Sequence, residues 1–244
     1  MGQMNSSLYE KPIFRIAGDR GLLVEYGRAI DVRVNEKVRS MAMALEKDPP
    51  AGVIESIPAF CSILLLYDPL KTTPNSLKKS LTALEKTLTT LKIPPPKTIE
   101  IPVCYGGEYG PDIAFVADNS GLTIEDVVRL HAEPEYVIHM VGFAPGFPFL
   151  GGLPETLYTP RLETPRTHVP EGSVGIANNQ TGVYPVSSPG GWRLIGRTPQ
   201  HLFDPQRTDP IPYRSGDRIR FRSISQAEYE RLAAEKGLHP RACQ

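Results

Sequence analysis

The hydrophobic positions in the N-terminal third of the chain predict strands and helices in the order ββαββα. Four short apolar runs, bounded by glycine, proline or charged residues, are typical of strands. Two other stretches carry apolar side chains every three or four residues, which places them on one face of a helix; Asp31 can cap the first, and Thr73-Pro74 opens the second. The expected strands are Ile13–Ala17, Leu22–Tyr26, Val53–Ile57 and Ser62–Tyr67, and the helical stripes are Val34, Val38, Met41 and Leu45, then Leu77, Leu81, Leu84, Leu88 and Leu91.

Three consecutive prolines, Pro94 to Pro96, separate this part from the rest of the chain. Proline cannot continue a helix, and a run of prolines forms a stiff, extended spacer. We therefore expect an N-terminal domain at residues 1–93 and a second domain at residues 97–244.

The second part begins with a strand and two helices and then changes character. From Tyr136 onward, short apolar runs alternate with glycine and proline, a pattern typical of an all-β barrel or sandwich. Ser225 and Glu228 predict the cap of a last, peripheral helix. The segment Gly142–Pro154 fits neither a helix nor a strand. The expected elements are a strand at 98–105, helices at 112–117 and 123–132, and strands at 136–141, 173–177, 182–186, 192–196 and 217–221.

Charge and cysteine content exclude several classes of protein. Lysine plus arginine and aspartate plus glutamate number 27 each, so no basic field favours nucleic acid. The apolar runs are too short to cross a membrane, and the N-terminus lacks the pattern of a secretion signal. The three cysteines, Cys61, Cys104 and Cys243, form no C-x-x-C pair, which argues against a disulfide framework and against a zinc site. We expect a cytoplasmic protein.

The run Gly191–Thr198 resembles the phosphate-binding loop G-x-x-x-x-G-K-[S/T], with Arg197 in place of the lysine. A phosphate loop must lead into a helix whose amides hold the phosphates. Here Pro199 follows directly, and the middle of the run has a strand pattern. We therefore expect no phosphate loop, but a glycine turn at Gly190 and Gly191 before a strand.

The segment with the sequence GFAPGFPFLGGLP suits the rim of a rigid pocket. Glycine lets the backbone approach a ligand, proline fixes the shape, and phenylalanine excludes water. A packed loop without a ligand is the alternative. His139, in the strand directly before this segment, is either a core residue or a proton carrier. The candidates in the segment are Phe143, Pro145, Gly146 and Phe147.

A second group of candidates lies between Arg166 and Thr198. Arginine offers a charged fork for a carboxylate or a phosphate, and successive glycine amides form concavities of the size of an anion. Amide and hydroxyl side chains orient small polar substrates. Solvated arginines and an ordinary β-turn are the alternatives, and Cys104 is better explained as a buried thiol than as a nucleophile. The candidates are Arg166, Gln180, Thr181, Tyr184, Ser188, Gly190, Gly191, Trp192 and Arg197.

Three motifs carry a resemblance to a known family. They are GDRGLLVEYG, YVIHMVGFAPGFPFLGGLP and TPRTHVPEGSVGIANNQTGVYPVSSPGGWRLIGRTP, and the likeness extends from Ile13 to Arg222. The chain resembles the B subunits of bacterial 5-oxoprolinase, also known as allophanate hydrolase subunit 1, a family that includes a sporulation-kinase inhibitor. The resemblance implies an α+β protein with a small N-terminal α/β domain and a cyclophilin-like β-barrel.

The resemblance also implies a function. Family members pair with a related C subunit and, in 5-oxoprolinase, with an A subunit; together these open the lactam of 5-oxoproline to glutamate at the expense of ATP. The hypothesis for this chain is one cleft facing the partner, in which Arg166 and Arg197 hold carboxylate or phosphate, Gln180, Thr181 and Ser188 orient the amide, and His139 carries a proton or supports the site. Two alternatives remain, an inhibitor of a sensor histidine kinase and a carboxyltransferase component whose biotin arrives on another protein.

Overall fold

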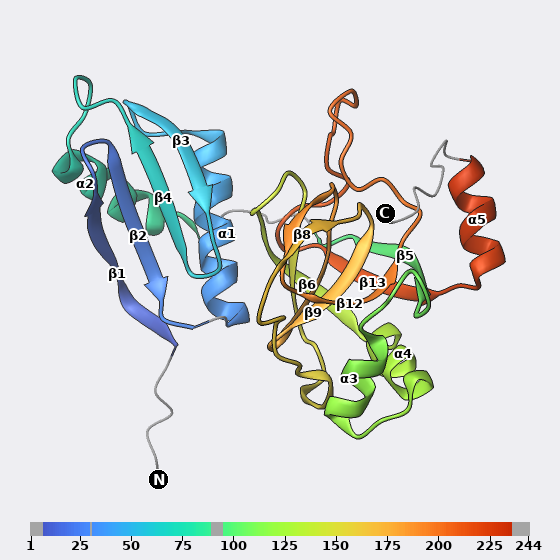
Figure 1. Ribbon diagram of the computed structural model, residues 1–244. Coiled ribbons are helices and arrows are strands. Elements are labelled where there is room, and N and C mark those ends of the chain that lie inside the picture. Colours follow the sequence, from blue (N-terminus) through green and yellow to red (C-terminus); the bar gives the residue numbers. More distant parts are fainter. Residues whose placement is uncertain (1–6, 30, 89–94, 236–244) are drawn as a thin grey trace, which may run out of the picture. The chain divides into compact units, whose positions relative to one another are not determined.

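The computed structural model describes residues 7–29, 31–88 and 95–235 (Figure 1). Its contacts divide the chain into two compact units, Met1–Pro95 and Pro96–Gln244. That each unit folds independently as a domain stays a prediction.

In its described residues, the N-terminal unit contains a four-stranded antiparallel sheet with the strand order β1-β2-β4-β3 and two helices, as the pattern predicts (Figure 1). Alternate residues of the central strands, such as Leu22 and Val24 or Ile63 and Leu65, are buried against the helices. The second helix ends at Glu85, before Leu88 of the predicted helical stripe, and Leu91, the last leucine of that stripe, lies outside the described residues. The elements are β1 (Leu8–Ala17), β2 (Gly21–Gly27), α1 (Val32–Lys47), β3 (Val53–Pro58), β4 (Ser62–Tyr67) and α2 (Pro74–Glu85).

Both helices of this unit begin at the residues that the sequence predicts as caps. The carboxylate of Asp31 accepts the amide of Arg33 at 2.8 Å and the hydroxyl of Ser7 at 2.6 Å. The hydrogen bond from Ser7 above all, and then that from the side chain of Arg33, lower the pKa of Asp31 to about 2. The hydroxyl of Thr73 accepts the amide of Ser76 at 3.2 Å. Each cap satisfies a backbone donor that has no partner inside the helix.

In the described residues of the second unit, seven strands close into a barrel with the order β10-β7-β6-β13-β5-β12-β9. The predicted barrel is confirmed. Most of the side chains in its interior are apolar, and side chains of α3 and α4 pack against them. The barrel strands are β5 (Thr98–Tyr105), β6 (Glu135–Val141), β7 (Pro148–Gly151), β9 (Ser173–Ala177), β10 (Gln180–Val183), β12 (Arg193–Arg197) and β13 (Arg218–Ser223), and the helices are α3 (Ile113–Ser120), α4 (Ile124–Ala132), α5 (Gln226–Glu235) and the short 3₁₀ helix η2 (Glu155–Leu157).

Three strands were not predicted. The expectation that Gly142–Pro154 contains no strand was wrong, because β7 lies within it and pairs with β6 and β10. β8 (Arg166–Val169) and β11 (Ser188–Gly190) form a two-stranded ribbon that is separate from the barrel sheet. Strands of three or four residues are too short to show a two-residue period, so their partners and not their sequence define them. The strand expected at 182–186 ends at Val183.

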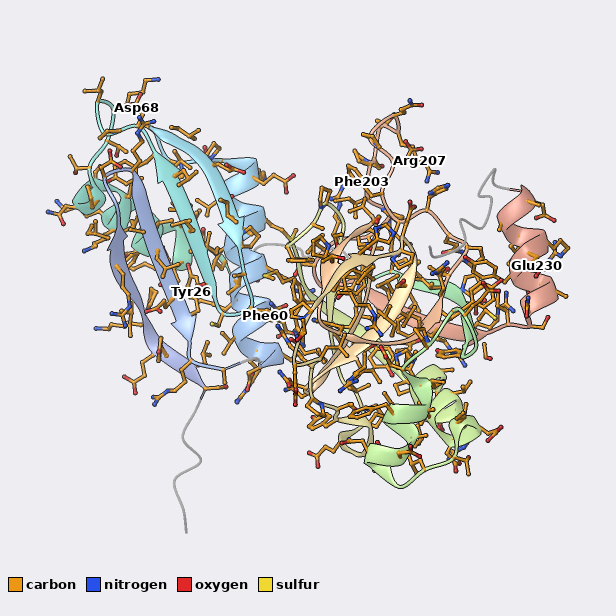
Figure 2. All side chains as sticks on the ribbon, in the orientation of Figure 1. Tyr26, Phe60, Asp68, Phe203, Arg207 and Glu230 are labelled. Atoms are coloured by element: carbon orange, nitrogen blue, oxygen red, sulfur yellow. The ribbon has the colours of Figure 1, made fainter. Side chains whose placement is uncertain are left out.

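The loop between β12 and β13 projects from the barrel and carries Phe203 and Arg207 (Figure 2). Further along the chain, α5 begins where Ser225 accepts the amide of Glu228 at 3.2 Å, as predicted. Every helix within the described residues is too short or too polar to span a lipid bilayer.

Candidate functional site

An aromatic cluster forms where three distant segments meet outside the barrel core. The ring of Phe147 lies at its centre, 4.9 Å from Phe149, 5.2 Å from Tyr184 and 5.4 Å from Trp192 between ring centroids. The cluster is distinct from the barrel interior and includes Val169 of the β8–β11 ribbon. The structure thus brings the Gly-Pro-Phe segment together with the two aromatic residues of the later candidate group.

A closed turn holds Phe147 in place. The amide of Gly142 donates to the carbonyl of Phe147, and the amide of Phe147 donates to the carbonyl of Ala144, both at 3.0 Å. Gly146 has φ 81°, and its carbonyl accepts the hydroxyl of Tyr213 at 2.6 Å. Phe143, which is 69% exposed, has φ 69°, a conformation that non-glycine residues rarely adopt. The neighbouring Pro145 is also exposed.

At two positions, glycine leaves room for the rings of the aromatic cluster to pack. A Cβ at Gly182 would lie 3.0 Å from the ring of Phe147 and 3.1 Å from that of Trp192, and a Cβ at Gly190 would overlap the hydroxyl of Tyr184. The absent side chains therefore let the strands carry aromatic rings in direct contact with the backbone.

Arg166 is fixed by a carboxylate. Its Nη2 donates to Asp112 at 2.8 Å, whereas its Nη1 is buried and has no hydrogen-bond partner among the described residues. The hydroxyl of Ser188 is likewise buried and unpartnered there. Arg166 pairs with Gly190, and Ser188 with Val169, in the β8–β11 ribbon. Buried donors normally have partners, so both groups retain unused capacity to bind a ligand; among the described residues, Nε of Arg197 and the side-chain nitrogen of Gln180 are in the same state.

Arg166 and Arg161 also act on the aromatic cluster. Burial raises the pKa of the Tyr184 hydroxyl, and the charges of Arg161 and Arg166 oppose part of that rise. The chain around Arg161 is held beside the glycine turn, because the amide of Leu162 donates to the carbonyl of Gly191 at 2.8 Å. The side chains of Arg161 and Arg166, the hydroxyl of Tyr184 and the glycine turn thus lie at the aromatic cluster.

Arg197 makes its contacts elsewhere. It is 9% exposed, and its guanidinium lies 5.8 Å from the ring centroid of Tyr109. Burial raises the pKa of Tyr229 on α5, and the charge of Arg197 opposes the rise. Among the described residues, the ring contacts of Arg197 are with a second outer cluster that includes Cys104, and its buried Nε has no hydrogen-bond partner there. We leave Arg197 out of the proposed site.

Thr181 points into the barrel. It is fully buried, and its hydroxyl donates to the carbonyl of Gly175 at 3.0 Å and lies 2.8 Å from His131 Nε2. A hydroxyl has one proton, so Nε2 of His131 must donate to it. Nδ1 of the same ring then accepts the hydroxyl of Tyr105 at 2.8 Å. The hydroxyl of Thr181 is thus occupied inside the core, and we leave it out of the proposed site.

Two further candidates lie on the barrel strands β6 and β10. His139 is 6% exposed, and a Cβ at Gly151 of β7 would overlap its imidazole ring, so β6 and β7 pack tightly there. Gln180, at the start of β10, has a buried side-chain nitrogen without a hydrogen-bond partner in the described residues. The roles expected for His139 and Gln180 stay predictions.

Sequence reasoning missed Asp112, His131 and Arg161. Asp112 was recognised only as the start of a helix. His131 carries a readable signal, because it lies four residues after Val127 and so shares the buried face of α4. Burial lowers the pKa of His131 to about 3. No spacing in the sequence distinguishes Arg161 from an ordinary exposed arginine.

A cavity of about 400 Å³ lies apart from the aromatic cluster, between the loop after β5 and the start of α5. Cys104 lines it, and burial raises the pKa of the Cys104 thiol, which favours the neutral form over a nucleophilic thiolate. Tyr105 to Tyr109 and Ile224 to Gln226 complete the lining.

Comparison with known proteins points to one family. The family model described as carboxyltransferase domain, subdomain C and D, matches residues 12–213. The 5-oxoprolinase B subunit of Bacillus subtilis (strain 168) is 41% identical over 89% of this chain and 95% of its own length. The urea amidolyase of Lachancea kluyveri is 26% identical over 96% of this chain, which corresponds to 15% of that protein. The crystal structure of TTHA0988 has a TM-score of 0.75 at 37% identity, over 84% of this chain and 40% of that one.

Proposed function

Since this chain belongs to the family of carboxyltransferase-domain subdomains C and D, we propose that it is the B subunit of a 5-oxoprolinase. Such a complex adds water across the amide C–N bond of the 5-oxoproline lactam and yields glutamate. We further propose that the chain is inactive without its partner subunits.

At the level of residues, the proposal rests on the hydrogen bonding of Arg166. One of its terminal nitrogens is anchored to Asp112, and the other is buried without a partner among the described residues. 5-Oxoproline carries one carboxylate on a small ring, and a guanidinium is a planar, permanently charged donor for a carboxylate. We infer that Arg166 Nη1 binds this carboxylate and that Ser188 donates to the lactam carbonyl.

The aromatic cluster then forms the back of the site. Phe147 and Trp192 are almost fully buried and hold the β8–β11 ribbon against a rigid surface. Gly190 and Gly191, beside them, are half-exposed, and we propose that their backbone lies next to the ligand. A rigid wall reduces the entropy lost when a small substrate is oriented. Phe143 and Pro145 stay predicted as the rim.

ATP supplies the driving force for lactam opening in the proposed complex. The segment of this chain that most resembles a phosphate loop forms the strand β12, so its amides pair within the barrel. These residues do not fit ATP phosphates. We propose that ATP binds on another subunit, and we assign no step on this chain to it.

The proposed partners are a related C-type subunit and an A-type subunit. This chain corresponds to 40% of the TTHA0988 chain and 15% of the Lachancea urea amidolyase, so related modules occur within longer chains. Such fusion supports a role beside further domains. The urea amidolyase likeness also supports a second candidate, a carboxyltransferase component that works with a biotin carrier.

Reconstitution tests the function. The chain is co-expressed with the A and C subunits of its own genome, and glutamate release from 5-oxoproline is measured with and without ATP. We expect ATP-dependent release that requires all three chains. Absence of release by the assembled wild-type complex, together with carboxyl transfer from biotin to urea in a complex with a biotin carboxylase, would replace this proposal by the second candidate.

A substitution tests the site. Arg166→Ala removes a charge-assisted hydrogen bond to the substrate, and we expect kcat/KM to fall by about 10- to 100-fold. Arg15→Ala is the matched control, because Arg15 forms an exposed ion pair with Glu25 at 2.6 Å in the N-terminal sheet. Activity of Arg166→Ala equal to that of Arg15→Ala would remove Arg166 from the site.

A further inference from the structure

Asp112 occupies the capping position of α3 but does not cap the helix. An aspartate there commonly accepts an amide of the first helical turn. Here no side-chain capping bond forms, and both carboxylate oxygens bond elsewhere: one accepts Arg166 Nη2 at 2.8 Å, and the other accepts the amide of Leu194 at 2.7 Å. We propose that Asp112 is a positioning residue that sets the guanidinium of Arg166 for an anionic substrate. The inference rests on the proposed function of Arg166.

The carboxylate is itself fixed by the barrel. Besides the bond from the amide of Leu194, the amide of Asp112 donates to the carbonyl of Leu194 at 2.9 Å. Two bonds in opposite directions thus hold Asp112 on β12, and Leu194 packs in the aromatic cluster. Asp112 therefore links the cluster to an arginine of the β8–β11 ribbon, a sheet that is separate from the barrel.

Burial favours the ion pair between Asp112 and Arg166 over contacts of either group with solvent. The side chain of Asp112 is 11% exposed and that of Arg166 is 30% exposed. A buried carboxylate needs a cation and hydrogen-bond donors, and a long arginine side chain left without its partner samples several rotamers. The bond to Nη2 thus selects one orientation of the planar fork, in which Nη1 is the terminal nitrogen left for a ligand.

Asp112 should therefore affect the binding of substrate, measured as KM, and not the turnover number kcat. Asp112 touches Arg166 and the backbone, and acts on the substrate only through Arg166. Loss of its charge should raise KM for 5-oxoproline and leave kcat nearly unchanged. An aspartate that merely supports the start of α3 would instead lower the amount of folded protein and leave KM as it is.

The kinetic test is a double-mutant cycle in the reconstituted complex. Asp112→Asn keeps the size of the side chain but removes its charge, and we expect KM to rise about tenfold, within the range of coupling between contacting residues. Asp112→Asn combined with Arg166→Ala should be no worse than Arg166→Ala alone. Effects that multiply in the double variant would overturn the inference.

A second variant covers the case in which Asp112→Asn does not fold. Arg166→Lys keeps the charge but has a single nitrogen, which can reach Asp112 or the substrate but not both. We therefore expect a rise in KM with kcat retained. A KM equal to that of the wild type would show that the fork fixed by Asp112 is not used.

A third measurement does not depend on activity. Phenylglyoxal modifies accessible guanidinium groups, and mass spectrometry gives the rate at each arginine of the isolated chain. We expect Asp112→Asn to raise the rate at Arg166 severalfold and to leave Arg218 unchanged. Glu135→Gln is the matched control, because Glu135 pairs with Arg218 at 3.0 Å on the surface and should affect Arg218 alone.

The two proposals fail in different ways. A raised rate at Arg166 in a chain whose complex releases no glutamate would refute the proposed function and leave the restraint of Arg166 by Asp112 in place. An unchanged rate at Arg166 would refute the positioning role, even in a complex that is fully active.

Discussion

The two units of the chain differ in what they bury. Among the described residues, and leaving tyrosine, tryptophan and cysteine aside, the N-terminal unit has one buried polar side chain, Asn35. The barrel unit has eight, namely Asp112, His131, His139, Thr159, Ser173, Thr181, Arg197 and Thr198. A buried polar group costs free energy unless it is hydrogen-bonded, so a unit that carries many of them depends on networks.

The difference indicates where binding chemistry lies. The sheet and helices of the N-terminal unit are held by apolar packing, which supplies stability without a preferred ligand. In the barrel unit, Asp112 accepts a hydrogen bond from Arg166, and His131 is hydrogen-bonded to both Tyr105 and Thr181. We therefore expect stability to depend on apolar packing in the N-terminal unit and on apolar packing together with polar networks in the barrel unit.

The largest effect is expected from a core truncation in the N-terminal unit. Leu65→Ala removes a fully buried side chain and should lower the free energy of unfolding by about 2 to 5 kcal/mol. Urea unfolding is followed by circular dichroism for the whole chain and by fluorescence of Trp192, the single tryptophan, for the barrel unit. If the units fold independently, the Trp192 transition keeps its midpoint.

The matched variant in the barrel is Ile176→Ala, which should shift the Trp192 transition. A Trp192 midpoint that moves equally in Leu65→Ala and Ile176→Ala would show that the two units unfold as one.

The next effect is a dependence on pH that comes from the barrel. Burial lowers the pKa of His131 from 6.5 to about 3. Between these values the unfolded chain binds a proton that the folded chain does not. The contribution of neutral His131 to the free energy of unfolding is therefore complete above pH 6.5. As the pH falls below 6.5, this contribution decreases by about 1.4 kcal/mol per pH unit, or by about 2 kcal/mol at pH 5.

His131→Gln isolates this contribution. Its amide can accept from Tyr105 and donate to Thr181 but does not titrate. The free energy of unfolding, measured by Trp192 fluorescence at pH 8 and pH 5, should fall about 2 kcal/mol less in the variant than in the wild type. Equal losses in both proteins would contradict a neutral, buried His131.

A smaller effect is expected when the His131 network is broken at constant pH. His131→Phe keeps a ring that can stack on Phe221, as the imidazole does at 4.6 Å between centroids. It leaves the hydroxyl of Tyr105 without its acceptor, which should cost about 1 to 2 kcal/mol at pH 8. His131→Gln should cost less, and a reversed order of the two variants would show that the ring and not the hydrogen bonds is needed.

The smallest effect compares one helix cap in each unit. Asp31→Ala and Thr123→Ala each remove a side chain that accepts an amide of the first turn, at 2.8 and 3.1 Å, and each should cost about 1 kcal/mol. Only Thr123→Ala should move the Trp192 transition. A shift of that transition in Asp31→Ala would mean that the stabilities of the two units are coupled.

Local sequence patterns were sufficient to predict the elements of the N-terminal unit and to identify the family. Leu22, Val24, Ile63 and Leu65 alternate along their strands, and Val34 and Val38 follow the turn of a helix, so each element can be read from neighbouring residues alone. The long motifs of the barrel unit likewise identify relatives without any contact being known.

The choice of a barrel over a sandwich came from the family resemblance, whereas the residue pattern alone predicted the order of most elements, a β-rich second unit and the types of side chain available for binding. The tertiary structure decided which of them meet: Arg166 pairs with Asp112 across 54 residues, Arg197 lies beside Tyr109 instead, and Thr181 faces His131 inside the barrel. Periodicity reports only the face on which a residue lies. Strand pairing and register, which join residues distant in the chain, determine its partners.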